Sequence, residues 1–332
     1  MSTISQSSLP SRRHINVFTH NDLDGVACAV LLSMYAKQID AGITVVYCTP
    51  GTVYDELKKL KSILQIAYET DVATPIAREI YVTDIALGVQ SAGIMEWFLD
   101  HGCSVESIDH HALKTHHKYP WMTVTSSPSI CAADLVMSFL GNYKYIRFPS
   151  AVDDFVRHVS GWDSHRFPVA ERREYEDYNL ALKALGEKSA QSFFFGALME
   201  EPNQPLRIKD TYLGPVVDEL YGNQRKYCAL HGKNTFTFTD QGYCVVAVFA
   251  DQFVSSVADY VLDHHPEADI CAVIQMPVCV SLRTRNPGID LFTNFAMPRG
   301  GWGHAGAAAF PIKDKITSQI LSPIIDMSIM GL

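Results

Sequence analysis

Two clusters of acidic and imidazole side chains, far apart in the sequence, carry the chemistry that this chain offers. The first is the hexapeptide His20–Gly25 (HNDLDG), and the second is the triplet Asp109–His111 (DHH). Each cluster follows a short apolar run of the kind that forms a buried strand. Carboxylates and imidazoles are ligands of divalent cations, and a pair of cations can activate water against a phosphate ester. The residues therefore favour a metal-dependent phosphoesterase.

Alternating strand-like and helix-like segments from Ile15 to about Val124 predict the scaffold that positions these clusters. Apolar and β-branched runs predict strands at Ile15–Thr19, Ile43–Cys48, Ile80–Thr83 and Ser104–Ile108, and apolar periodicity predicts helices at Val26–Lys37, Val53–Ala67 and Val89–Leu99. Repeated units of this length imply a parallel sheet with helices on both faces. In such sheets, ligands bind beyond the carboxyl ends of the strands. We therefore predict an α/β fold with its site at that edge.

Polar residues follow three of these strands, at the end where a ligand would bind. His20, Asp22 and Asp24 follow the first strand, Asp84 follows the third, and the triplet Asp109–His111 follows the fourth. The aspartates have ordinary alternatives as helix caps or turn residues. Because the three clusters converge on one edge, we expect metal ligation, with Asp84 as a carboxylate that bridges two cations.

The triplet predicts more than one role. His110 can be a ligand, His111 can face a substrate phosphate, and Asp109 can hold an imidazole N–H group. The same letters recur at Asp263–His265, where they end a helical pattern and run into a proline. Histidines are favoured at the C-terminal end of a helix, so we expect no site at the second triplet.

A further carboxylate is needed to complete the ligand set of one metal. The candidates are Asp153, Asp154 and Asp163. Asp163 belongs to the sequence Gly161–His165 (GWDSH), which we predict to be a loop after a helical stretch, and it is the favoured ligand. Asp153 and Asp154 are typical of acids in the first turn of a helix.

A second, smaller α/β domain is predicted in the C-terminal part. Residues from about Ala132 to Leu230 have a mainly helical pattern. Strand signals then return at Thr235–Thr239, Tyr243–Phe249, Ile270–Gln275 and Val278–Leu282, with a helix at Val254–Leu262. We place a catalytic, metal-binding domain at 14–190, a helical linker at 191–232 and a substrate-binding domain at 233–332.

A glycine-rich sequence, GGWGHAGAAA from Gly300 to Ala309, is the main signal in this second domain. Glycines such as Gly301 and Gly303 let a backbone approach a ligand closely, and His304 would add a donor. We predict that the small residues after it begin a helix whose N–H groups favour anions. A glycine-rich turn that packs a helix on a sheet is the alternative. Arg283, on a predicted strand, suits a phosphate or is a plain surface arginine.

Composition limits the partners. The 332 residues are 47% hydrophobic and 19% charged, which is typical of a globular chain large enough for two domains. The net charge of -9 disfavours a long duplex, which needs a broad basic surface.

Eight cysteines are scattered singly, which indicates reduced thiols. No apolar run approaches the ~20 residues that span a bilayer, and the Ser-rich start reads as a short flexible leader without a signal region. We therefore expect a cytoplasmic protein that does not enter a membrane.

In their order, these motifs resemble those of the DHH/DHHA1 phosphoesterases over nearly the whole chain. The matching sequences are HNDLDG, the strand end at Asp84, IDHH, Asp163 within WDSH, SLRT and GGWGHAGAAAF. The sequences FTHNDLDGVACAVL and WDSHRF are most similar to the nanoRNase B branch, which degrades very short RNA. Two features depart from the family pattern. Only Asn21 separates His20 from Asp22, and Trp302 interrupts the glycines, where it could stack on a base or simply pack.

The resemblance implies a two-metal phosphodiesterase that hydrolyses short single-stranded oligoribonucleotides to mononucleotides, with Mn²⁺ as the expected cofactor and Mg²⁺ as an alternative. It implies these roles: cation ligands Asp22, Asp24, Asp84, His110 and Asp163, with His20 in addition; a phosphate contact from His111; and oligonucleotide binding by Arg283, Gly301, Gly303 and His304. We expect the cations, bridged by Asp84, to deprotonate a water that attacks the phosphodiester in line. The metals and His111 would hold the developing charge.

Several other functions stay open at this point. The same metal centre would serve a phosphodiesterase of cyclic or linear dinucleotides. A RecJ-like single-strand exonuclease would be expected to have further domains and a basic channel, which the length and charge disfavour. A nucleotide-binding module without activity is the alternative from a different class. A homodimer is also left open.

Overall fold

The computed structural model describes residues 13–69, 78–111, 118–125, 130–167, 169–275 and 279–312. The chain forms two compact units, an N-terminal unit that ends at Val217 and a C-terminal unit that begins at Asp218. The division falls within helix α8 (Gly214–His231). The bounds that the sequence suggests for the two domains and their linker stay a prediction.

The N-terminal unit is built on a parallel sheet with the strand order β2-β1-β3-β4-β5. The strands are β1 (His14–Thr19), β2 (Gly42–Tyr47), β3 (Arg78–Thr83), β4 (Ser104–Asp109) and β5 (Met122–Val124). Ile15 and Val17 of β1 are fully buried, as expected for a central strand that is covered on both faces. The predicted α/β fold with a parallel sheet is confirmed.

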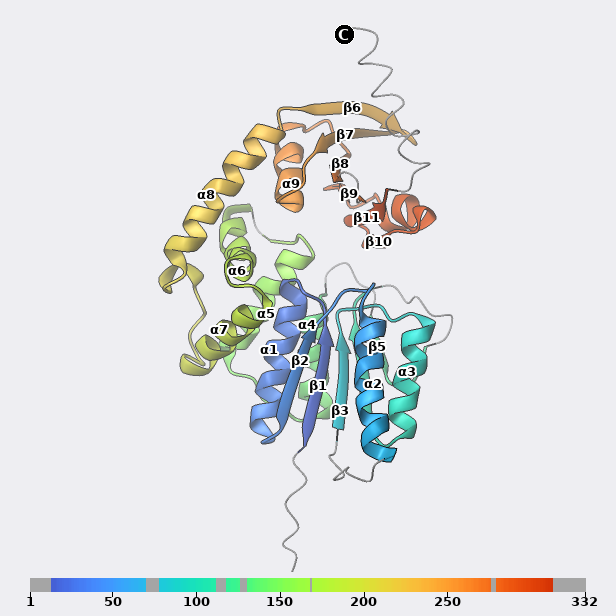
Figure 1. Cartoon of the computed structure of the whole chain (residues 1–332). Helices are drawn as coiled ribbons and strands as arrows, with labels where there is room; N and C mark the ends of the chain where they lie inside the picture. The colour runs from blue at the N-terminus through green and yellow to red at the C-terminus, as the bar shows by residue number, and fades with distance from the viewer. Residues whose placement is uncertain are drawn as a thin grey trace, which may run out of the picture. The chain divides into compact units, whose positions relative to one another are not determined.

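Helices cover both faces of this sheet (Figure 1). They are α1 (Leu23–Gln38), α2 (Val53–Glu69), α3 (Val89–Asp100), α4 (Ala132–Tyr143), α5 (Ser150–Asp163), α6 (Arg172–Leu185) and α7 (Glu187–Glu200), with short 3-10 turns at Val169–Glu171 and Ile208–Asp210. Ile80 and Val82 of β3 pack in one core with α2 and α3. Tyr81, between them, lies against Phe139 of α4, because successive side chains of a strand point to opposite faces.

The C-terminal unit is a mixed sheet with the order β10-β11-β9-β8-β7-β6. Its elements are β6 (Thr235–Asp240), β7 (Tyr243–Phe249), α9 (Val254–His264), β8 (Ile270–Gln275), β9 (Cys279–Arg283), a π-helical turn (Phe292–Ala296), a 3-10 turn (Met297–Arg299), β10 (Trp302–Gly303) and β11 (Ala307–Pro311). Helix α9 packs on one face, with side chains of α8. Ile289, Leu291 and the π-helical turn pack on the other.

The helix predicted after the glycine-rich sequence is wrong, because Ala307–Pro311 forms strand β11. This strand pairs antiparallel with both β9 and β10. Ala308 and Phe310 are buried in the core, whereas the alternate residues Ala307 and Ala309 are partly exposed. Alanine favours helices, but pairing and burial against neighbouring strands override that preference. An anion site at a helix N-terminus is therefore excluded at Ala307–Pro311.

The eight cysteines are free thiols, and seven of them are buried. In the described part of the chain, no helix combines the length and the apolar character needed to cross a bilayer.

Glu106 of β4 yields a prediction about stability. It lies opposite Tyr81 in the sheet register, and burial, opposed by Lys144 and reinforced by Glu79, raises the pKa of its carboxyl from 4.5 to about 7. Between pH 4.5 and about 7, the folded chain holds a proton on Glu106 that the unfolded chain releases. The folded state therefore loses stability as the pH rises through this range.

We expect Glu106→Gln to raise the free energy of unfolding at about pH 8 by about 1 kcal/mol, a figure reduced for the partial exposure of the carboxyl. At about pH 4, where the wild-type carboxyl is protonated in both states, the gain should vanish. Urea unfolding at both pH values measures this, with Glu219→Gln on exposed α8 as the control. An equal effect of the variant at both pH values would contradict the prediction.

Candidate metal centre

The turn after β1 places His20, Asp22 and Asp24 at the carboxyl edge of the sheet. Asp22 is the N-cap of α1, and its Oδ1 accepts a hydrogen bond of 3.1 Å from the Gly25 N–H. Its Oδ2 lies 2.7 Å from His20 Nδ1. A Cβ atom at position 25 would lie 2.1 Å from the His20 carbonyl oxygen. Only glycine therefore allows this tight path into the helix, and the capping role falls on Asp22, not on Asp24.

Asp24 lies in the first turn of α1 and is held by the N-terminus of α4. Its Oδ2 accepts the Ala132 N–H at 2.7 Å, and its Oδ1 accepts the Ala133 N–H at 2.8 Å. These N–H groups belong to the first turn of α4, where a helix has no backbone partners of its own and favours a negative charge. Asp24 is thus fixed in position with its remaining lone pairs available to a cation.

Asp84 follows β3 in a backbone conformation that is uncommon for a residue other than glycine. Its φ is 58°, in the left-handed region, which aspartate tolerates better than most residues. The N–H of Asp84 donates to the Ile108 carbonyl of β4 at 3.0 Å. Its carboxylate is 2% exposed, and Oδ2 accepts no hydrogen bond from the described residues. This orphaned oxygen points to a positive partner.

His110 presents one ring nitrogen to the carboxylates. Its Nδ1 lies 2.9 Å from the Ile130 carbonyl oxygen. Because a carbonyl can only accept, Nδ1 carries a proton, and Nε2 is the ring nitrogen that faces the carboxylates. Nε2 lies 3.3 Å from Asp84 Oδ1, 3.6 Å from Asp24 Oδ2 and 3.8 Å from Asp163 Oδ2. A second hydrogen bond of this kind is the usual way to orient a metal-binding histidine.

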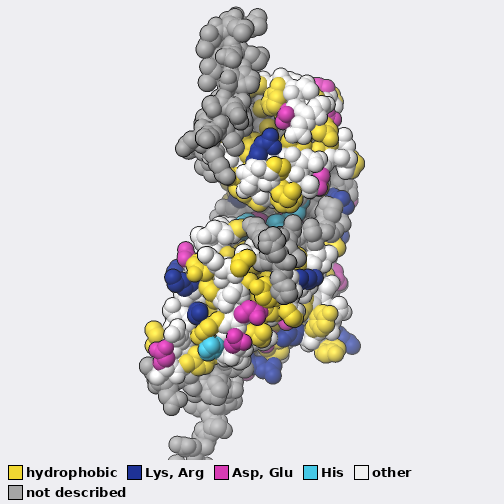
Figure 2. Space-filling view, turned by 90° about the vertical axis from the view of Figure 1, so that its right-hand side faces the viewer, with side chains coloured by type: hydrophobic (Ala, Val, Ile, Leu, Met, Phe, Trp, Pro, Cys, Tyr) yellow, Lys and Arg dark blue, Asp and Glu magenta, His cyan; other side chains and the backbone are white. Residues whose placement is uncertain are grey.

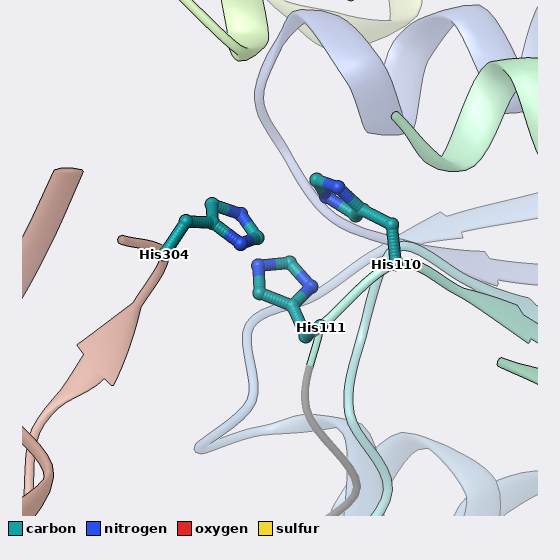
Figure 3. Close-up of side chains that lie close together, drawn as sticks. All are labelled: His110, His111 and His304. Atoms are coloured by element: carbon teal, nitrogen blue, oxygen red, sulfur yellow. The ribbon is translucent and has the colours of Figure 1, made fainter. Parts of the chain in front are cut away.

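His111 is turned differently from its neighbour, as the close-up of the end of β4 shows (Figure 3). The centroids of the two rings lie 4.5 Å apart, at 62° to one another. His111 Nδ1 is 2.8 Å from Asp109 Oδ1, which also accepts the His111 backbone N–H. Burial alone would lower the pKa of His111, but the hydrogen bond and charge of Asp109 raise it. Asp109 therefore orients an imidazole that favours its protonated form.

Asp163 is the last residue of α5, so the prediction that it lies in a loop is wrong. The Ser164 N–H still bonds to the Ser160 carbonyl as the helix ends. Asp153 is in the first turn of the same helix, as predicted, and Asp154 forms an ion pair with Arg157. A helix end holds the Asp163 carboxylate more firmly than a loop would.

Two groups of ligand atoms result, and Asp84 is near both. One group is His20, Asp22 and Asp84, and the other is Asp24, His110 and Asp163, with the atoms of each group within 4.8 Å of one another. Asp84 Oδ2 lies 3.9 Å from His20 Nδ1, and Asp84 Oδ1 lies 3.3 Å from His110 Nε2. Carboxylate oxygens and neutral imidazole nitrogens suit Mn²⁺ and Mg²⁺.

The pKa values of the buried aspartates also favour a bound cation. Burial and the charges of Asp22 and Asp24 raise the pKa of Asp84 well above its usual value. Burial likewise raises the pKa of Asp24, although His110 and the N–H groups of α4 oppose the shift. Hydrogen bonds from His20 and His111 instead lower the pKa values of Asp22 and Asp109. Buried carboxylates gathered at one place are costly to keep ionised without a positive charge.

Two buried threonines, which the sequence reading missed, tie the ligand-bearing segments together. Thr83 Oγ1 donates to Thr19 Oγ1 at 2.8 Å, and Thr19 Oγ1 donates to the Gly25 carbonyl at 3.0 Å. Both side chains are fully buried. This chain of hydrogen bonds links the end of β3, the end of β1 and the first turn of α1. Its only signal in the sequence is a threonine immediately before two of the three polar clusters, at His20 and at Asp84.

The residues proposed for substrate binding lie in the C-terminal unit. Arg283 ends β9 and donates to the Leu282 carbonyl and to Ser255 Oγ. His304 lies in the turn between β10 and β11. A Cβ at Gly301 or Gly303 would lie 2.2 Å or 2.4 Å from a carbonyl oxygen of β11. The glycines thus allow a close approach to the chain's own strand. The triplet Asp263–His265 ends α9, as predicted.

Comparison with known proteins supports the chemistry of the N-terminal site. Over 321 residues the chain is 24% identical to oligoribonuclease NrnB of Bacillus subtilis (strain 168), and the match covers 91% of this chain and 73% of that protein. No family model matches the chain.

Solved structures share the fold. The pGpG-specific phosphodiesterase PggH from Vibrio cholerae has a TM-score of 0.51 and 15% identity, and the match covers 95% of this chain and 98% of that one. RecJ in complex with Mn²⁺ from Thermus thermophilus has a TM-score of 0.53 and 12% identity, over 97% of this chain and 52% of that one. Both likenesses extend over both units of this chain.

The parallel sheet, the cluster of carboxylates and imidazoles at its edge and the similarity to NrnB define a metal-dependent phosphodiesterase. The motifs specify the group further. They are similar to those of the DHH/DHHA1 phosphoesterases near nanoRNase B, in line with the 24% identity to NrnB.

We expect divalent cations to stabilise the folded chain, because they bind the assembled ligands and not the unfolded chain. Adding Mn²⁺ should raise the unfolding temperature, and chelation should reverse the rise. Asp84→Asn, which removes one charge at nearly constant shape, should lose most of this response while raising the unfolding temperature of the metal-free chain. Differential scanning fluorimetry with and without Mn²⁺ measures both effects, and an undiminished response in the variant would contradict the assignment of Asp84.

We expect Thr83→Val to weaken cation binding about tenfold, because the ends of β1 and β3 lose their link. The free energy of unfolding should fall by about 1 kcal/mol. Isothermal titration calorimetry with Mn²⁺ measures the affinity. Thr44→Val, the same change on exposed β2, should leave it unaltered. Equal affinities for the two variants would show that the threonines do not position the ligands.

Proposed function

We propose that the chain hydrolyses short single-stranded oligoribonucleotides to mononucleotides with the help of two divalent cations, Mn²⁺ or Mg²⁺. The observation that carries this proposal is the pair of ligand groups, one of which contains Asp84, while the other lies beside its Oδ1 through His110. His20, Asp22 and Asp84 would hold one cation, and Asp24, His110, Asp163 and Asp84 would hold the other. When bound, the cations would supply an activated water and neutralise charge on the phosphate.

The chain's own residues have distinct tasks in this proposal. Ile130 fixes the ring of His110 through Nδ1, so that Nε2 faces the carboxylates. The N–H groups of α4 hold both oxygens of Asp24 in place. Asp109 directs the ring of His111 through Nδ1, which leaves Nε2–H to donate to a phosphate oxygen as charge develops there. A rigid arrangement of this kind needs no reorganisation during the reaction.

The length of the substrate is proposed from two observations. The similarity to NrnB, an oligoribonuclease, extends over 91% of the chain. Basic side chains are also scattered: on the face of the N-terminal unit that carries α2 and α3, described Lys and Arg side chains lie among acidic and hydrophobic ones (Figure 2). With a net charge of -9, such a surface gives little counterion release on a long nucleic acid.

A linear dinucleotide phosphodiesterase is a second candidate. It is favoured by the likeness to PggH, which is specific for pGpG and matches this chain over 95% of its length. Both candidates need the same metal centre, so only the range of substrates separates them.

Hydrolysis of labelled RNA of increasing length, from a dinucleotide upward, tests the proposal in the presence of Mn²⁺ and after chelation. Long single-stranded DNA, pGpG and a cyclic dinucleotide are the comparison substrates. We expect metal-dependent loss of the shortest RNAs of any sequence. Activity on pGpG alone would favour the dinucleotide enzyme, and faster cleavage of long DNA would favour a RecJ-like exonuclease.

Asp84→Asn should lower kcat by at least about a thousandfold, because it removes the carboxylate that is proposed to contact both cations. Glu56→Gln, on α2 and away from these groups, is the control. Near-wild-type turnover by a folded, metal-loaded Asp84→Asn chain would overturn the assignment of this site.

A further inference from the structure

The outer edge of β6 in the C-terminal unit is long, and no described residue pairs with it. β6 is the last strand of its sheet (Figure 1), and within the described residues its pairing is to β7 alone. Four of its six residues, from Phe236 to Thr239, are exposed. An edge strand of this kind offers its free N–H and C=O groups to another strand, and monomeric proteins usually shorten, charge or cover such an edge.

The other sheet edges have that protection. β10 has two residues and β5 has three. Residues 185–189 line a pocket along β2, and Tyr47 at the end of β2 hydrogen-bonds to Gln191 of α7. β6, in contrast, has the sequence TFTFTD, with no proline, no lysine and no charge before its last residue.

The hairpin that joins β6 to β7 determines which groups face outward. Gln241 and Gly242 both have positive φ values, 51° and 86°, which define a two-residue turn of type I′. Asp240 and Tyr243 flank this turn and form a hydrogen-bonded pair. Since hydrogen-bonded positions alternate along an antiparallel strand, the N–H and C=O groups of Thr235, Thr237 and Thr239 point away from β7.

The sequence of β6 from Thr235 to Thr239, TFTFT, reads the same in both directions about Thr237. A second copy that runs antiparallel about this residue would place Thr237 opposite Thr237 and Thr235 opposite Thr239, with their outward backbone groups paired. Phe236 would then lie opposite Phe238 in the closer, non-hydrogen-bonded positions, where aromatic pairs are favourable. These rings are 37% and 43% exposed in the single chain.

We propose that two copies of this chain associate through β6, in antiparallel pairing about Thr237, to form a continuous sheet across a twofold axis. Charged substitutions at Thr237 test whether a second copy pairs at this axis. Lysine in place of Thr237 would face lysine in the second copy, and like charges directly opposite one another destabilise strand pairing. Aspartate at the same position would do the same, whereas one copy of each variant would attract.

Analytical ultracentrifugation of the full chain provides the test. We expect a dimer for the wild type, monomers for Thr237→Lys and Thr237→Asp measured separately, and a dimer again when these two variants are mixed. Ser62→Lys, the same charge added on exposed α2, should stay dimeric. Because Thr237 is exposed, circular dichroism should show both variants folded.

A wild-type chain that stays monomeric at the highest attainable concentration overturns the proposal. Single variants that dimerise as well as the wild type overturn it too, because the interface then lies elsewhere. A mixture that stays monomeric contradicts the proposed axis, since opposite charges at Thr237 should restore the pairing.

Discussion

Mutual repulsion among buried carboxylates is the constraint on which the N-terminal unit depends. Asp84 is almost completely buried, with Asp22, Asp24, Asp109 and Asp163 close enough to raise its pKa. Burying one unpaired charge costs several kcal/mol, so a group of this kind persists only if surrounding contacts offset the cost. The unit does this with fixed dipoles and imidazoles, which partly balance the charge and leave room for cations.

Each of these compensating contacts also fixes geometry. The N-terminus of α4 holds Asp24, and the carbonyl of Ile130, just before that helix, orients His110. One helix start thus positions two ligands from different parts of the chain. Helix α5 brings Asp163 to the same place at its last turn. The stability of the scaffold and the preorganisation of the site therefore rest on the same few contacts.

The sequence predicted the scaffold well where burial alone decides the structure. Strands such as β1 and β3 are continuous apolar runs, and ligands at the ends of parallel strands follow from topology. The prediction was wrong for Ala307–Pro311, where pairing with two strands overrides the helical preference of alanine. It also missed the contacts of Asp24 with Ala132 and Ala133. These involve the backbone N–H groups at the start of α4, and a contact with backbone atoms of a distant segment leaves no mark in the residue types.

The spacing of the ligands along the chain has a consequence for biosynthesis. The first proposed ligand, His20, and the last, Asp163, enclose nearly all of the parallel sheet and its first five helices. During translation, the complete ligand set cannot exist until α5 has left the ribosome and docked on α1. A shorter nascent chain offers only isolated carboxylates and imidazoles, which bind cations weakly. Under the proposed assignment, metal loading would therefore be a late step, and hydrolytic capacity would follow the completed folding of this unit.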